Sequence, residues 1–85
     1  MTDRIPVRTI SAGDYCTNTH LNLEALRTEG ILFWTRDPYI KKLEELAAEI
    51  CPKNTLAVVD VHPYTDNGGP KGDRHYFFGT ALIPT

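Results

Sequence analysis

Residues 55–83 constrain the fold of this chain more than any other stretch. They contain two runs rich in β-branched and aromatic residues, TLAVVDVHPY and RHYFFGTALI, joined by the polar segment TDNGGPKGD. Two such runs around a glycine- and proline-rich connection are typical of a β-hairpin. We therefore predict strands over residues 55–64 and 74–83, with the turn centred on Gly68 and Gly69.

The centre of this turn also predicts the register of the hairpin. It sets His62 opposite His75 and Asp60 opposite Phe77. Because side chains alternate across a sheet, the hairpin then has one mixed face and one apolar face. The mixed face is expected to stay open or to meet a partner, and it carries Val58, Asp60, His62, Tyr64, Asp73, His75, Phe77 and Gly79. The apolar face is expected to pack on the helices, and it carries Ala57, Val59, Val61, Tyr76, Phe78, Thr80 and Leu82.

Residues 37–50 carry the pattern of an amphipathic helix. Asp37 is a good N-cap, and Pro38 suits the first helical position. The pair Cys51-Pro52 predicts the end of the helix, because a residue before proline disfavours the α region. Apolar residues recur at helical spacing at Ile40, Leu43, Leu46, Ala47 and Ile50.

The first thirty residues predict a strand followed by a helix. Residues 5–11, IPVRTIS, alternate as a strand does, and residues 12–14 suit a turn. Residues 21–29 predict a short helix that ends before Gly30. The alternation of apolar positions in the same segment leaves a strand as the alternative.

The apolar run ILFWT, residues 31–35, has no helical spacing and predicts a buried central strand with Trp34 in the core. The expected order of elements is therefore β-α-β-α-β-β. This order implies an α+β fold, a two-layer sandwich in which two helices pack on one face of about four strands. At 85 residues, the chain is expected to form a single domain.

The overall charge excludes two classes of protein. A net charge of −2 and an isoelectric point near 5.8 do not provide the basic stripe on which phosphate-dominated binding depends. Nor do they provide the dense acidic surface of a DNA mimic. No run of residues is apolar enough for a membrane span, and the N-terminal segment does not resemble a signal peptide. We therefore expect a cytoplasmic protein with no membrane partner and with reduced thiols.

Asp60, His62 and His75 are the residues with the most chemical potential. Imidazole and carboxylate groups ligate zinc or iron, and histidine also performs acid–base chemistry near neutral pH. The same residues on an open sheet face would equally serve binding, or would simply be solvated. Spacing alone is weak evidence for a site, so solvated residues are favoured first and binding second, and no metal and no cofactor is predicted.

The connection between the two strands is a second candidate for recognition. Its glycines allow backbone amides to approach an anion, and Lys71 and Arg74 lie close by in sequence. It lacks the spacing of a phosphate-binding loop and does not open a helix, which favours an adaptable hairpin tip. The predicted binding residues are Asp60, His62, Tyr64, Lys71, Arg74 and His75.

Cys16 raises the alternative of a thiol-dependent enzyme. It comes between the first predicted strand and the first predicted helix, and a helix N-terminus lowers a thiol pKa. The order of elements resembles that of small sulfur-carrier domains, which place a reactive cysteine near this point. Those domains use Cys-Pro, whereas Thr17 follows here. A disulfide to Cys51 would need the two Cα atoms within about 7 Å.

Taken together, these features favour a small non-catalytic protein that binds another protein. Compact domains of this size without catalytic motifs are typical of phage-encoded inhibitors, including anti-CRISPR proteins. The alternative is an RNA- or nucleic-acid-binding domain, because the same order resembles the C-terminal domain of a bacterial translation initiation factor. The final strand is expected at an edge of the sheet, where it would pair with its copy in a homodimer.

Overall fold

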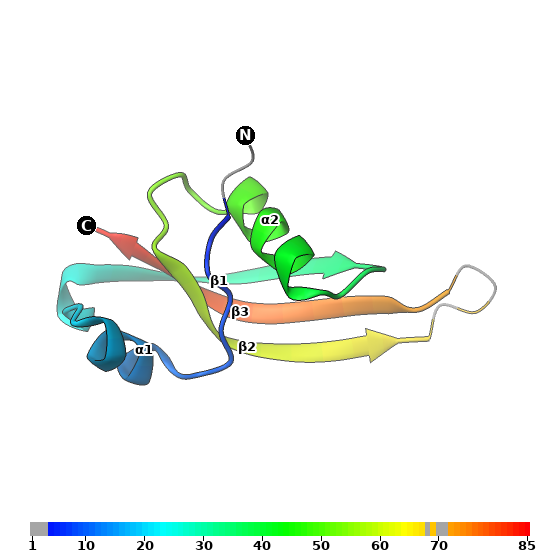
Figure 1. Ribbon diagram of the computed structural model, residues 1–85, viewed down its shortest axis with the longest axis horizontal. Helices are drawn as coiled ribbons and strands as arrows, with labels where there is room; N and C mark the ends of the chain where they lie inside the picture. Colours follow the sequence, from blue (N-terminus) through cyan, green and yellow to red (C-terminus); the bar gives the residue numbers. More distant parts are fainter. Residues whose placement is uncertain (1–3, 68, 70–71) are drawn as a thin grey trace.

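The computed structural model describes residues 4–67, 69 and 72–85 and shows an α+β fold (Figure 1). Two helices and a three-stranded antiparallel sheet follow one another in the order α-β-α-β-β. The elements are α1 (Ala12–Thr19), the 3₁₀ turn η1 (Leu23–Ala25), β1 (Leu26–Thr35), α2 (Ile40–Ile50), β2 (Ala57–Asp66) and β3 (Arg74–Pro84).

The last strand lies in the middle of the sheet. The strand order is β1-β3-β2, and β3 is antiparallel to both of its neighbours. Consequently β1 and β2 run parallel to each other without touching, and α2 makes the connection between them. The prediction that the final strand lies at an edge is wrong. Residues 31–35 do form a strand, as part of β1, but the prediction that this strand is central is wrong. Only the C-terminal part of β3 is buried on both faces, since Ala81, Leu82 and Ile83 are all buried whereas Phe78 is 48% exposed.

The hairpin of β2 and β3 is confirmed, but its predicted register is wrong. His62 pairs with Phe78, and Tyr64 pairs with Tyr76, because the register shifts between Val59 and His62. At this β-bulge Asp60 adopts the left-handed conformation, with φ of 53°, and its N–H donates to the carbonyl of Ile10 at 2.7 Å. The bulge inserts an extra residue, so side chains after it change faces relative to those before it.

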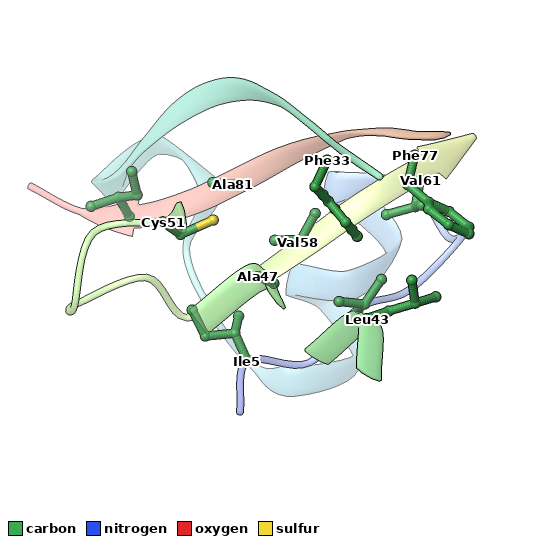
Figure 2. Close-up of a cluster of buried hydrophobic side chains, with 11 residues drawn as sticks. Ile5, Phe33, Leu43, Ala47, Cys51, Val58, Val61, Phe77 and Ala81 are labelled. Carbon is green, nitrogen blue, oxygen red and sulfur yellow. The ribbon is translucent and has the colours of Figure 1, made fainter. Parts of the chain in front are cut away.

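The larger hydrophobic cluster lies between α2 and one face of the sheet (Figure 2). Leu43 and Ala47 project from the helix onto this face, and Phe33 stacks on Phe77 with ring centroids 5.5 Å apart. The buried members of the cluster are Ile5, Val7, Phe33, Leu43, Ala47, Cys51, Val58, Val61, Phe77, Ala81 and Ile83.

A smaller cluster lies on the opposite face, beneath α1. Cys16 packs there on Ala57, Val59 and Leu82. These positions neighbour residues of the larger cluster along the same strands, and adjacent side chains of a strand point to opposite faces. The two helices therefore cover opposite faces of the sheet, and the expectation of both helices on one face is wrong.

The first predicted strand is reduced to an isolated parallel bridge between Val7 and Val58. Val58 donates its N–H to the carbonyl of Pro6 at 2.8 Å, and Arg8 donates to the carbonyl of Val58 at 2.9 Å. The Arg8 side chain also forms an ion pair with Glu44 of α2 at 3.3 Å. The segment thus lies along the outer edge of β2 and is held to α2 as well.

Residues 12–14, predicted as a turn, are the first turn of α1. Ser11 caps the helix, since its hydroxyl accepts the N–H of Asp14 at 3.2 Å. His20 ends it in the left-handed conformation, with φ of 59°. Residues 21–29, predicted as a helix, instead contain η1 and the first part of β1, which continues through Gly30, so the alternative of a strand is right for residues 26–29.

The helix predicted over residues 37–50 is confirmed as α2, which ends at Ile50 before Cys51-Pro52. Its predicted cap is wrong: Tyr39 is the N-cap and makes no capping hydrogen bond with its side chain. Asp37 instead donates its backbone N–H to the Thr35 hydroxyl at 3.1 Å.

Candidate binding surface

One half of the sheet face that carries α1 is left uncovered, and it is aromatic. The register aligns Trp34 with Tyr76 and Tyr76 with Tyr64, which makes one row across the three strands. The next row contains a leucine, a phenylalanine and a histidine by the same register. We call these two rows the aromatic sheet face: Leu32, Trp34, His62, Tyr64, Tyr76 and Phe78.

The aromatic sheet face is exposed to an unusual degree for side chains of this kind. Tyr64 is 59% exposed, Leu32 54%, and Trp34 and Phe78 48% each. A large aromatic side chain carries about 150–250 Å² of surface, so three half-exposed ones and a leucine leave on the order of 300–400 Å² of contiguous apolar area. The largest apolar patch of an ordinary monomer is about 300–600 Å² and often functional, so this surface is the candidate interaction site of the described chain.

The limited reach of α1 is the reason for this exposure. The helix has eight residues and packs on Ala57, Val59 and Leu82, which lie at the other end of the same face. Figure 1 shows α1 at the end of the sheet near the C-terminus, whereas the hairpin of β2 and β3 extends in the opposite direction. Among residues 4–67, 69 and 72–85, no other helix lies on this face to cover the rows nearer the hairpin tip.

Arg74 supplies the positive charge at the rim of the aromatic sheet face. Its guanidinium lies 5.4 Å from the centre of the Trp34 ring, which is the geometry of a cation–π contact. Tyr64 and Tyr76 lie beside this pair, with their ring centroids 6.2 Å apart and tilted by 45°. These contacts favour the observed arrangement of the aromatic rings without burying them, and a ring already in its bound position costs less to order on binding.

Asp60, His62 and His75 do not converge. His62 and Asp60 form an exposed pair, with Nε2 and Oδ1 3.1 Å apart. His75 points to the opposite face of the sheet, where its Nδ1 lies 3.2 Å from the Thr65 hydroxyl. Among the residues that the structure describes, no three His, Cys, Asp or Glu side chains are placed to hold a metal ion. The hypothesis of a metal site at these three residues is therefore not supported.

Three of the predicted binding residues, His62, Tyr64 and Arg74, lie at one surface, with Asp60 at its edge. Lys71 lies outside the described residues. The larger part of the surface was not predicted, because the sequence pattern of Trp34, Tyr76 and Phe78 indicates core residues. One sequence signal for this surface was present in β3, whose residues are apolar on both faces of the sheet. The two short helices of the described chain are too few to cover both faces completely.

The two cysteines are free thiols, buried in different clusters on opposite faces of the sheet. Cys16 lies inside α1, so the expected position ahead of a helix N-terminus is wrong. Burial raises the pKa of the Cys51 thiol, and the nearby carboxylate of Glu29 raises it further. Both effects favour the protonated thiol, which is the less reactive form.

Among the described residues, no helix has the length and apolar character needed to cross a membrane. No protein-family model, curated protein or solved structure matches this chain at a significant level. The order α-β-α-β-β also removes the ground for a likeness to sulfur carriers or to the initiation-factor domain, since that likeness depended on β-α-β-α-β-β.

Proposed function

We propose that this chain is a non-catalytic binding protein that recognises another protein through the aromatic sheet face. The observation that carries the proposal is the contiguous exposure of Leu32, Trp34, Tyr64 and Phe78, each about half exposed or more, on a rigid antiparallel sheet. Tryptophan, tyrosine and arginine are the residues that contribute most to protein interfaces. The sheet presents all three side by side.

The chemistry of the surface indicates the chemistry of the partner. The centre of the aromatic sheet face is apolar, so the matching surface is expected to be apolar as well. Within the described part of the chain, Arg74 contacts Trp34 and forms no ion pair with a carboxylate. A partner carboxylate at this rim would be stabilised by a charge-assisted hydrogen bond.

A protein of this kind acts by covering a surface that its partner needs. This is the mode of action of a small inhibitor, and we propose the phage-encoded type, such as an anti-CRISPR protein, as the functional class. The two buried free thiols fit a reducing compartment, and we place the protein in the cytoplasm.

Single-stranded nucleic acid is the second candidate partner, and one observation favours it. Trp34, Tyr76 and Tyr64 form a row across three strands, and exposed aromatic rings on a sheet are platforms on which bases stack. The net charge of −2 opposes this reading, because binding to single strands depends strongly on positive charge.

Site-directed crosslinking tests the proposal. A photo-crosslinking residue in place of Tyr64 lies within the aromatic sheet face, whereas the same residue in place of Tyr39, which is 56% exposed, lies at the start of α2. We expect a discrete protein adduct from position 64 that disappears when Phe78 is changed to Ser. Equal adducts from positions 64 and 39, or adducts that survive Phe78→Ser, would contradict the proposal.

Titration with oligonucleotides separates the two candidates. Trp34 is the only tryptophan of the chain and lies in the aromatic sheet face, so its fluorescence reports directly on occupancy. Quenching by oligo(dT) or oligo(U) that falls steeply with salt would support nucleic acid and displace the protein-binding proposal. No quenching at low salt, together with the crosslink from position 64, is the expected result.

A further inference from the structure

We propose that two copies of this chain pair through the free edges of β1, antiparallel and about a two-fold axis at Thr28, to form a continuous six-stranded sheet. The inference stands on the edge strand and goes beyond the proposed function. Only its consequence for binding depends on the aromatic sheet face being a recognition surface.

β1 offers an unbroken edge for pairing. It pairs with β3 on one side, without a register shift from Leu26 to Thr35, and has no partner strand among the described residues on the other side. Residues 27–30 are all exposed, and nothing lies within 4 Å of the position that a Cβ on Gly30 would occupy. β1 also contains no proline, no lysine and no bulge, and its two charged residues, Arg27 and Glu29, are of opposite sign.

The opposite edge of the sheet is protected. The N-terminal segment lies along the first half of β2, through the bridge of Val7 to Val58. Pro63 lies in the second half and has no N–H to donate. β1 is therefore the edge of the described sheet that can accept a further strand.

The hydrogen-bonding pattern defines which residues face outward. In an antiparallel ladder, alternate residues of a strand direct their N–H and C=O groups to the same side. Thr85 donates its N–H to the carbonyl of Ala25 at 3.4 Å, so odd-numbered residues of this stretch face β3. Thr28 and Gly30 consequently direct their N–H and C=O groups outward, towards an incoming strand.

Charge then selects the register. Two identical antiparallel strands are related by a two-fold axis, which here must pass through a residue pair. An axis between two residues would set residues whose N–H and C=O groups point to β3 opposite residues whose N–H and C=O groups point outward, and these could not bond. An axis at Thr28 places Arg27 opposite the partner's Glu29, and does so twice. An axis at Arg27 or Glu29 would oppose like charges, which destabilises a strand pair.

Arg27 and Glu29 are available for this exchange. Their side chains are 57% and 46% exposed and form a loose pair within the strand, with Nη2 and Oε1 3.6 Å apart. An exposed pair of this kind contributes little by itself, so the two side chains can turn to the partner strand at small cost. At the axis, the two Thr28 residues would exchange a pair of backbone hydrogen bonds.

The consequence for binding is bivalency. A two-fold axis perpendicular to the sheet keeps both aromatic sheet faces on the same side of the six-stranded sheet. Leu32 is four residues from the axis, so the two faces begin on the order of 25–30 Å apart at about 3.3 Å per residue. A partner with two matching surfaces would then be held by avidity, without a tighter contact at either one.

A pair of charge-reversal variants tests the dimer by sedimentation equilibrium on the full chain. We expect wild type to dimerise, and Arg27→Glu and Glu29→Arg each to be monomeric, because each opposes like charges in the dimer. Mixed together, the two variants are expected to form a heterodimer, because each strand then meets the opposite charge. An ion pair within one chain cannot produce association on mixing.

Thr28→Pro provides a second arm. It removes an N–H that faces away from β3, so the monomer is expected to fold with unchanged stability while dimerisation weakens by about tenfold or more. A wild type that is monomeric at millimolar concentration, or variants that do not associate on mixing, would overturn the proposal. A dimer lost in Phe78→Ser but kept in Thr28→Pro would also overturn it, and would assign dimerisation to the aromatic sheet face. The crosslink from position 64 does not require a dimer, so failure here leaves the proposed function open to its own test.

Discussion

At the scale of single residues, Asp60 decides which side chains the sheet exposes. Its left-handed backbone allows one extra residue in β2 before the strand resumes pairing with β3. Without the bulge, Val59 and Val61 would share a face; with it, Val59 lies beneath α1 and Val61 beneath α2. A sequence pattern with a period of two cannot show where a bulge lies, and asparagine or aspartate in the left-handed region is only a weak signal.

Gly79 leaves room for the packing around this bulge. A Cβ built on Gly79 would lie 2.8 Å from Val58 Cγ1 and 3.0 Å from Val61 Cγ2, both of which belong to buried, β-branched side chains. We expect Gly79→Ala to lower the free energy of unfolding by about 1–3 kcal/mol. Chemical denaturation measures this loss. Gly13→Ala is the matched control: nothing lies within 4 Å of its Cβ position, and alanine in a helix is expected to stabilise by about 0.5–1 kcal/mol.

The Cys51 thiol makes the stability of the folded protein depend on pH. Burial, and then Glu29, raise the pKa of its thiol in the folded protein. The unfolded chain therefore loses the thiol proton at a lower pH than the folded chain does. The contribution of the buried thiol to the free energy of unfolding is complete below the ordinary thiol pKa of about 8.5, and it is lost as the pH rises through the pKa of the folded protein. We expect wild type to lose more stability than Cys51→Ala above about pH 8.5. Denaturation midpoints of the two proteins that fall in parallel with pH would contradict this.

At the scale of elements, α2 and the hairpin could be predicted because local pattern and tertiary packing agree. The apolar stripe of α2 meets the sheet, and proline ends the helix where expected. α1 could not be predicted, since its sequence AGDYCTNT has one buried residue and its threonines bond back to carbonyls of the helix itself, as Thr17 does to Gly13 at 3.0 Å. The second half of β1, residues 31–35, was predicted as a strand, but its first half was predicted as a helix because Gly30, which is typical of a helix end, lies within the strand.

The bulge in β2 provides a test at this scale. Asp60→Gly removes the steric cost of φ near 53°, so we expect stability equal to wild type within about 0.5 kcal/mol. Asp60→Val places a β-branched residue in the left-handed region, and we expect a loss of about 1–2 kcal/mol. Thermal unfolding distinguishes the two variants. Equal losses in both would indicate that the Asp60 side chain, rather than its backbone conformation, supports the bulge.

At the scale of the whole molecule, the chain has more apolar sheet surface than its two helices can cover. Its principal extents are 46 × 28 × 18 Å, an elongated shape in which the hairpin extends beyond the helices (Figure 1). The candidate site could be predicted only in part, since His62, Tyr64 and Arg74 were identified but the surrounding aromatic residues were not. Which apolar face of a strand is covered depends on where the helices pack, and the residue pattern of a single strand does not predict that position.

Substitution of two neighbouring phenylalanines tests which face of β3 is part of the hydrophobic core. Phe77 is 8% exposed and stacks on Phe33, whereas Phe78 is 48% exposed in the aromatic sheet face. We expect Phe77→Ala to cost about 3–5 kcal/mol of unfolding free energy, and Phe78→Ala to cost less than about 1.5 kcal/mol. Urea denaturation of both variants makes the comparison. A cost for Phe78→Ala as large as that for Phe77→Ala would show that the aromatic sheet face is a core.

The central position of β3 in the sheet also limits when the sheet can form during translation. β1 and β2 share no ladder with each other, and every strand pairing in the described sheet uses residues 74–84. During synthesis, a nascent chain that has not yet reached Arg74 contains the residues of both helices and of β1 and β2, but lacks the strand with which β1 and β2 pair. The sheet can therefore form only after residues 74–84 have been made, and the parts of the aromatic sheet face on β1 and β2 come together in that one step.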